Sequence, residues 1–147
     1  MNYFDPKSVL LAKHAQHVVL IHFPIALFLT GVLFDFAGLR KPRPTLAAAA
    51  FANLMAAAIS VPFVLTSGIL AWRWQLEGQR LHGLLLFHLV LGCLTGLLIV
   101  AVAAIHFRAR KAPSLPTYRL PLELLATLAV IATGHLGGFL SGVNIPS

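Results

Sequence analysis

Long apolar runs separated by short polar stretches are the main pattern of this 147-residue chain. Four such runs lie at about 17–39, 46–72, 82–105 and 120–141. At about 1.5 Å of rise per residue in a helix, each can cross the roughly 30 Å hydrocarbon layer of a bilayer. Because the connections are short, consecutive helices are expected to be antiparallel neighbours. The pattern predicts an all-α integral membrane protein, in which residues 1–147 form a single antiparallel four-helix bundle.

The composition agrees with this prediction. Hydrophobic residues make up 59% of the chain and charged residues 10%, a balance typical of proteins that lie in lipid. The basic residues, which give a formal net charge of +7, form short clusters between the apolar runs and no continuous stripe. We therefore expect a lipid bilayer around the chain and no nucleic acid. The single cysteine, Cys93, has no CxxC or CxxCH context, so any redox group must be held non-covalently.

The distribution of Lys and Arg predicts how the bundle lies in the membrane. Seven of these residues fall in or beside the first and third connections, and four fall in the N-terminal segment and the second connection. By the positive-inside rule, the first and third connections face the cytoplasm and both termini lie on the non-cytoplasmic side. Trp72 and Trp74 then lie at the outer interface, where indole rings are enriched.

Three histidines from separate helices are predicted to lie at one depth. In this orientation, His22 and His88 come about five to six residues after the outer ends of their helices, and His135 comes about six residues before one. Each is then roughly 8 Å inside the outer boundary. A histidine within a membrane span is costly and usually faces a partner, a cavity or a metal. This shared depth is the strongest functional signal in the sequence.

A b-type haem is the first chemistry that fits this layer. A low-spin iron takes two axial imidazoles from facing helices, and the macrocycle needs small residues around it. Glycines beside the third histidine provide room, basic residues near the outer boundary can meet the propionates, and the more peripheral histidines can bind a second haem. The expected cofactor-binding residues are His22, His88, His135, His17, His14, Gly134, Gly138, Arg73 and Arg80.

Other interpretations of the same histidines stay open. The imidazoles of His22, His88 and His135 also suit a copper, zinc or iron ion, but no carboxylate or thiolate is expected beside them. Titrating histidines suit a proton or ion path, although few polar steps cross the predicted core. In the structural interpretation, the histidines are hydrogen-bonding struts between the helices of a cofactor-free subunit.

The carboxylates and the last histidine are predicted at the opposite, inner boundary. Asp35 and Glu123 are interpreted as members of structural ion pairs, and His106 as an end-of-helix residue. The expected partners of Asp35 are Arg40, Arg43 and Arg119.

Several segments resemble one known family. They are HVVLIHFPIAL at 17–27, SGILAW at 67–72 and GHLGG at 134–138, with Asp35 and His88 between them. Over nearly the whole chain they resemble the bacterial membrane family called domain of unknown function 2231. The resemblance implies a four-helix membrane domain in bacteria. Some relatives are joined to Rieske-type or cytochrome-type domains, which implies a place in electron transfer but brings no established activity.

These observations predict a b-type haem membrane protein of the bacterial inner membrane. It is expected to transfer electrons near the periplasmic side, with a Rieske-type or cytochrome-type redox partner. An electron carrier or subunit is favoured over a stand-alone enzyme, because no nucleophile, base and oxyanion arrangement is found. A homo-oligomer is compatible with the sequence, since four helices offer little surface to enclose a cofactor. The alternatives are a cofactor-free structural subunit and a copper or zinc binding or transport protein.

Overall fold

Four long helices make up most of the described chain in the computed structural model. The structure describes residues 13–40, 43–75, 77–78 and 80–141. The helices are α2 (Lys13–Arg40), α3 (Pro44–Gln75), α4 (Gly83–Ala109) and α5 (Arg119–Leu140). All four are long and apolar enough to cross a membrane, and the described residues include no strand. The all-α, four-helix membrane architecture predicted from the sequence is confirmed.

Prolines mark several of the helix limits. Pro44 is the first residue of α3, a position where the missing N–H leaves no hydrogen bond unmade. Pro113 and Pro116 lie in the connection between α4 and α5, which has no helical structure. Pro24 and Pro62 lie inside α2 and α3. Membrane helices tolerate such positions because neighbouring groups satisfy the freed backbone atoms.

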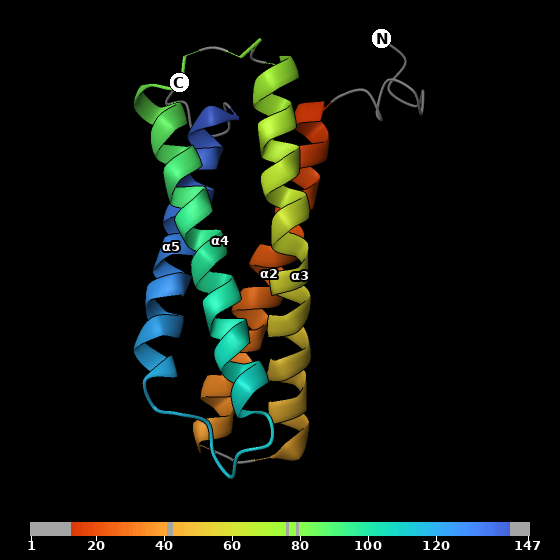
Figure 1. Ribbon diagram of the computed structural model, residues 1–147, viewed down its shortest axis with the longest axis vertical. Helices are drawn as coiled ribbons and strands as arrows, with labels where there is room; N and C mark the ends of the chain where they lie inside the picture. Colours follow the sequence, from red (N-terminus) through yellow and green to blue (C-terminus); the bar gives the residue numbers. More distant parts are fainter. Residues whose placement is uncertain (1–12, 41–42, 76, 79, 142–147) are drawn as a thin grey trace.

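The bundle is built from two helical hairpins. α2 packs most extensively against α3, α4 packs against α5 and α3, and α2 touches α5 only sparsely (Figure 1). These contacts form a ring, so α2 and α4 lie on one diagonal of the bundle. Both of these helices run downward in the view of Figure 1. Inward-facing residues of α2 and α4 can therefore meet across the bundle interior.

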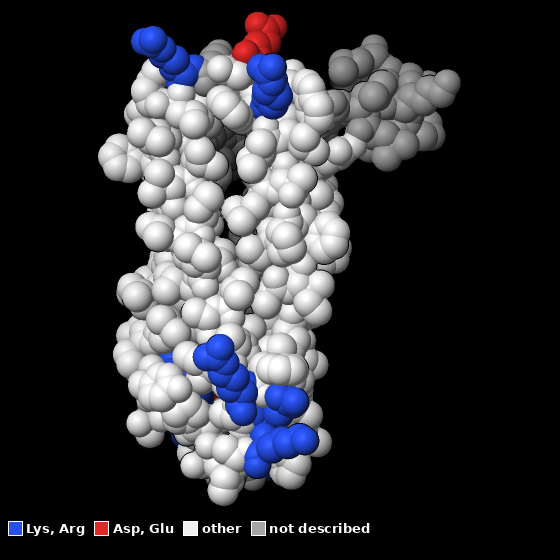
Figure 2. All heavy atoms as spheres, in the orientation of Figure 1, with Lys and Arg blue, Asp and Glu red and all other residues white. Residues whose placement is uncertain are grey.

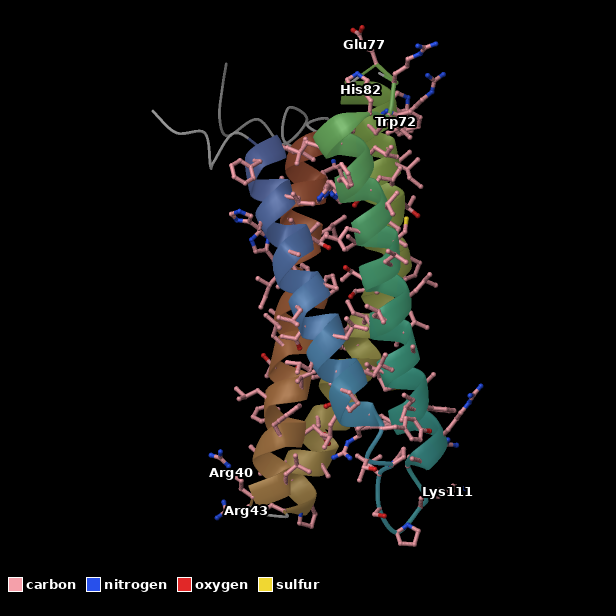
Figure 3. The ribbon with its side chains drawn as sticks, turned by 90° about the vertical axis from the view of Figure 1, so that its left-hand side faces the viewer. Arg40, Arg43, Trp72, Glu77, His82 and Lys111 are labelled. Carbon is pink, nitrogen blue, oxygen red and sulfur yellow. The ribbon has the colours of Figure 1, made fainter. Side chains whose placement is uncertain are left out.

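The two ends of the bundle differ in their side chains. One end, called here the basic end, is where α2 and α4 finish, and it carries Arg40, Arg43 and Lys111 (Figure 3). The other, the tryptophan end, carries Trp72 and Glu77. On the face shown in Figure 2, the Lys and Arg side chains gather at these ends and the long surface between them is uncharged. This distribution is that of a protein whose middle lies in lipid.

The buried core is apolar and includes residues of all four helices. Phe28 of α2, Leu54 of α3, Val102 of α4 and Ala126 of α5 have no exposed surface and belong to one cluster. Large hydrophobic side chains also cover the outside of the bundle. Examples with more than half of their surface exposed are Leu33, Phe63, Leu97 and Leu128.

Candidate functional site

Two of the three histidines predicted to share a site lie on the outer surface of the bundle. His22 is exposed, and its Nδ1 lies 2.6 Å from the carbonyl oxygen of Val18 in the same helix. His135 is also exposed, and its ring packs edge-on against Phe139, with 4.9 Å between the ring centroids. The structure therefore does not bring these two side chains together with His88 inside the bundle.

The helical period explains why they face outward. His22 precedes the buried Asp35 by 13 residues, about three and a half turns, so the two lie on opposite sides of α2. On α5, His135 follows the buried Arg119 by 16 residues, about four and a half turns. Depth in the membrane follows from topology alone, but the face of the helix depends on the number of turns from the buried residues.

His17 and His88 take inward-facing positions instead. Both are half-buried. His17 precedes Asp35 by 18 residues and His88 precedes His106 by 18, which is about five full turns in each case. Asp35 and His106 meet at the basic end, where their potential ligand atoms lie within 4.8 Å of each other. The two imidazoles therefore lie at one level on diagonal helices, about 27 Å from that meeting point.

Each of these imidazoles lies against a glycine of its own hairpin. His17 Nδ1 is 2.9 Å from the hydroxyl oxygen of Ser67, and a Cβ atom at Gly68 would lie 3.0 Å from His17 Cε1. In the other hairpin, a Cβ atom at Gly137 would lie 3.2 Å from His88 Cε1. Both distances are tighter than those of most real Cβ contacts. Glycine at these two positions therefore leaves space that the rings occupy.

His88 also carries an unsatisfied nitrogen. Its ring interacts with the main chain of Thr133 in α5, while its Nδ1 is buried and has no hydrogen-bond partner among the described residues. Buried polar atoms normally have a partner, because leaving one unmatched costs about 1–3 kcal/mol. An unmatched imidazole nitrogen inside a membrane span is therefore a candidate ligand atom.

The remaining predicted cofactor-binding residues have varied surroundings. Arg73 and Arg80 are exposed near the tryptophan end, the end at which propionates were expected. Gly138 is half-buried, whereas a Cβ atom at the exposed Gly134 would meet no neighbouring atom within 4 Å. The side chain of His14 lies outside the described residues.

A second group of candidate functional residues lies at the basic end. Asp35, His106, Arg119 and Glu123, called here the ionic cluster, are 7%, 3%, 5% and 0% exposed. Arg119 Nε donates a hydrogen bond to Asp35 Oδ2 at 2.9 Å. His106 Nε2 lies 2.8 Å from Glu123 Oε1, and Arg119 Nε lies 3.9 Å from the same oxygen. These contacts join α2, α4 and α5.

Sequence reasoning recognised the ionic cluster only in part. Arg119 was one of three expected partners of Asp35, and the structure selects it. His106 was interpreted as an end-of-helix residue, yet it is buried and bonded to Glu123. The helical period predicts that His106 is buried. His106 comes four residues after the core residue Val102, so it continues the buried stripe of α4.

The ionic cluster also bears on the expected metal site. Among the described residues, only Asp35, His106 and Glu123 bring three potential ligand atoms within 4.8 Å of one another. The three histidines expected to share one metal ion are not grouped in this way. In the ionic cluster, however, the guanidinium of Arg119 already bonds Asp35, and the 2.8 Å contact between His106 and Glu123 leaves no space for an ion between them. We therefore assign no metal to it.

Comparison with known proteins identifies the family. The model of the family described as predicted membrane protein (DUF2231) matches residues 13–143, and the chain therefore belongs to this family, as the sequence segments had suggested. No curated protein and no solved structure matches the chain.

Proposed function

We propose that this DUF2231 membrane protein binds haem b non-covalently and takes part in electron transfer, with His17 and His88 as the axial ligands. The haem was expected from the sequence, which counted both residues among the candidates but grouped His88 with His22 and His135. The observation that carries the revised pair is the placement of one inward-facing imidazole on each diagonal helix at a common level. When bound, the haem iron supplies reversible one-electron transfer.

The residues around this pair fit a haem in three ways. His88 has a buried nitrogen without a hydrogen-bond partner among the described residues. Gly68 and Gly137 let the two imidazoles pack closely against α3 and α5, which limits the positions that the rings can take. Ser67 lies 2.9 Å from His17 Nδ1, and a hydrogen bond to this ring nitrogen orients the imidazole.

The location of the site suggests the side of the membrane on which electrons are exchanged. The histidine pair lies toward the tryptophan end, which the positive-inside rule assigns to the periplasmic side of a bacterial inner membrane. Arg73 and Arg80 are exposed near that end and are suited to haem propionates or to an acidic surface of a partner. The proposed partner is a Rieske-type or cytochrome-type redox protein outside the membrane. A second copy of the chain is a further proposed component of the assembly.

Optical spectroscopy of the purified protein tests this proposal. After haem supplementation, the wild type is expected to show a Soret band and sharp reduced bands of a six-coordinate, low-spin haem. His17→Gln and His88→Gln should each lose the low-spin spectrum. His22→Gln and His135→Gln are matched controls, because they remove surface imidazoles from α2 and α5, and both should keep the spectrum.

Three outcomes would contradict the proposal in different ways. Loss of the spectrum in His22→Gln or His135→Gln, with retention in His17→Gln, would restore the grouping expected from the sequence. Absence of any Soret band, with all four variants assembling normally, would favour a cofactor-free structural subunit. Stoichiometric copper or zinc without porphyrin would favour metal binding or transport.

A further inference from the structure

The ionic cluster has no role in the proposed haem site. Its members lie about 27 Å from the level of His17 and His88, as five helical turns of α2 and α4 require. The apolar core residues Phe28, Val102 and Ala126 lie between the two levels and are fully buried. The ionic cluster therefore needs an explanation of its own.

The charges in the ionic cluster are unbalanced when the imidazole is neutral. Two carboxylates, Asp35 and Glu123, face a single guanidinium, that of Arg119, which leaves one net negative charge at a buried position. An uncompensated charge in a low-dielectric interior is expensive, and such groups normally gain a partner or a proton. One added positive charge makes the ionic cluster neutral. A divalent ion would instead leave the ionic cluster with a net positive charge.

The geometry favours a proton as that charge. Arg119 is engaged mainly by Asp35, at 2.9 Å, and lies 3.9 Å from Glu123. Glu123 has one oxygen 2.8 Å from His106 Nε2, a hydrogen-bond distance at which a proton lies between the two atoms and no larger ion fits. Its other oxygen, Oε2, is buried and has no hydrogen-bond partner among the described residues. That oxygen is available to carry a proton.

The helices around His106 and Glu123 determine which charged groups lie near these two residues and from which end of the bundle a proton can reach them. The described titratable groups that face it are Asp35 from α2 and Arg119 from α5, and α3 has no titratable residue between Pro44 and Trp72. Toward the tryptophan end, the apolar core blocks a polar path. Toward the basic end, Arg119 Nη1 donates to the carbonyl oxygen of Pro116 in the connection between α4 and α5, so that connection adjoins the ionic cluster.

We propose that His106 and Glu123 form a proton-binding site that exchanges with the solution at the basic end, with Asp35 and Arg119 as a fixed ion pair beside it. Binding transfers one proton from water to the pair, and release returns it to the same side. The site is closed toward the opposite side by the core, so it loads and unloads protons without forming a channel. The proton-binding site does not depend on haem.

Infrared difference spectroscopy of the full chain in lipid nanodiscs, recorded against pH, tests the site. The wild type is expected to show a pH-dependent carboxylic acid band whose frequency, owing to burial, differs from that of exposed carboxyl groups. Glu123→Gln, which keeps the hydrogen-bonding shape of the side chain, should abolish that band. Glu77→Gln is the matched control, because it removes an exposed carboxyl group in the connection between α3 and α4, and it should leave the band unchanged.

Proton counting gives a second, independent measurement. In an acid jump with a pH-sensitive dye, the wild type should take up about one more proton per chain than Glu123→Gln. His106→Gln should shift the pH at which the carboxyl band appears. Equal proton uptake in wild type and Glu123→Gln, or a carboxyl band that survives in Glu123→Gln, would overturn the proposal. If Glu123→Gln does not assemble, an unshifted band in His106→Gln would overturn it as well.

Discussion

The basic end and the tryptophan end place polar side chains inside the same bundle in different ways. At the basic end, Arg119 and Asp35 form an ion pair that links the α4–α5 hairpin to the α2–α3 hairpin. At the tryptophan end, His17 contacts Ser67 and Gly68, and His88 contacts Gly137, all within their own hairpins. The comparison indicates that protein contacts join the hairpins at the basic end. A ligand between the two imidazoles is proposed to join them at the tryptophan end.

The largest expected effect comes from breaking the link at the basic end. Arg119→Leu leaves Asp35 and Glu123 buried without their guanidinium, and should destabilise the fold by about 3–5 kcal/mol. The double variant Asp35→Leu with Arg119→Leu removes both charges of the pair and should recover most of that loss. Thermal unfolding in detergent measures both. Equal destabilisation by the single and double variants would show that packing, and not an unpaired charge, governs this end.

A smaller effect is expected from filling the space beside His88. Gly137→Ala places a Cβ atom 3.2 Å from His88 Cε1, and should cost about 1–3 kcal/mol of stability and lower haem occupancy. Gly134→Ala is the control, because a Cβ atom there meets nothing within 4 Å, and this variant should be at least as stable as the wild type. Haem titration and thermal unfolding report the two effects. Similar stability and haem occupancy in the two variants would contradict a tight packing of the His88 ring against Gly137.

The smallest effect is expected from a neutral hydrogen bond inside one hairpin. Thr95 Oγ1 and Thr133 Oγ1 lie 2.8 Å apart between α4 and α5. A double-mutant cycle with Thr95→Val and Thr133→Val should give a coupling energy of about 0.6 kcal/mol, the usual size for such bonds in membranes. A coupling energy as large as that of the ion pair would remove the contrast between links within a hairpin and links between hairpins.

The fold was largely predictable because the bilayer imposes it. An apolar run of sufficient length must satisfy its backbone hydrogen bonds internally, which makes it a helix whatever its side chains contact. Short connections then make neighbours antiparallel. The limits of α2 and α4 differ from the expected ones by four residues at Lys13 and Ala109, because a helix continues through polar residues at the membrane boundary.

The candidate sites were less predictable because a helix that is apolar on every side gives no sequence signal for the side that is buried. The four helices are hydrophobic on both the lipid-facing and the inner surfaces, so depth alone placed His22 in the predicted site and His17 only at its periphery. Counting turns from a residue known to be buried would have separated them. On α2 the buried reference residue is Asp35, and it can be recognised as buried only once its partner Arg119, 84 residues later, is known.

The sequence by itself determined that this chain crosses the membrane four times, that it belongs to the DUF2231 family, and which residue types are available inside the spans. Only the tertiary structure decided which of those residues face the interior. It placed His17 and His88 inward and His22 and His135 outward, and it joined His106 to Glu123. The physical reason is that hydrophobicity fixes the depth of a residue in the bilayer, whereas helix packing fixes the rotation of each helix about its axis.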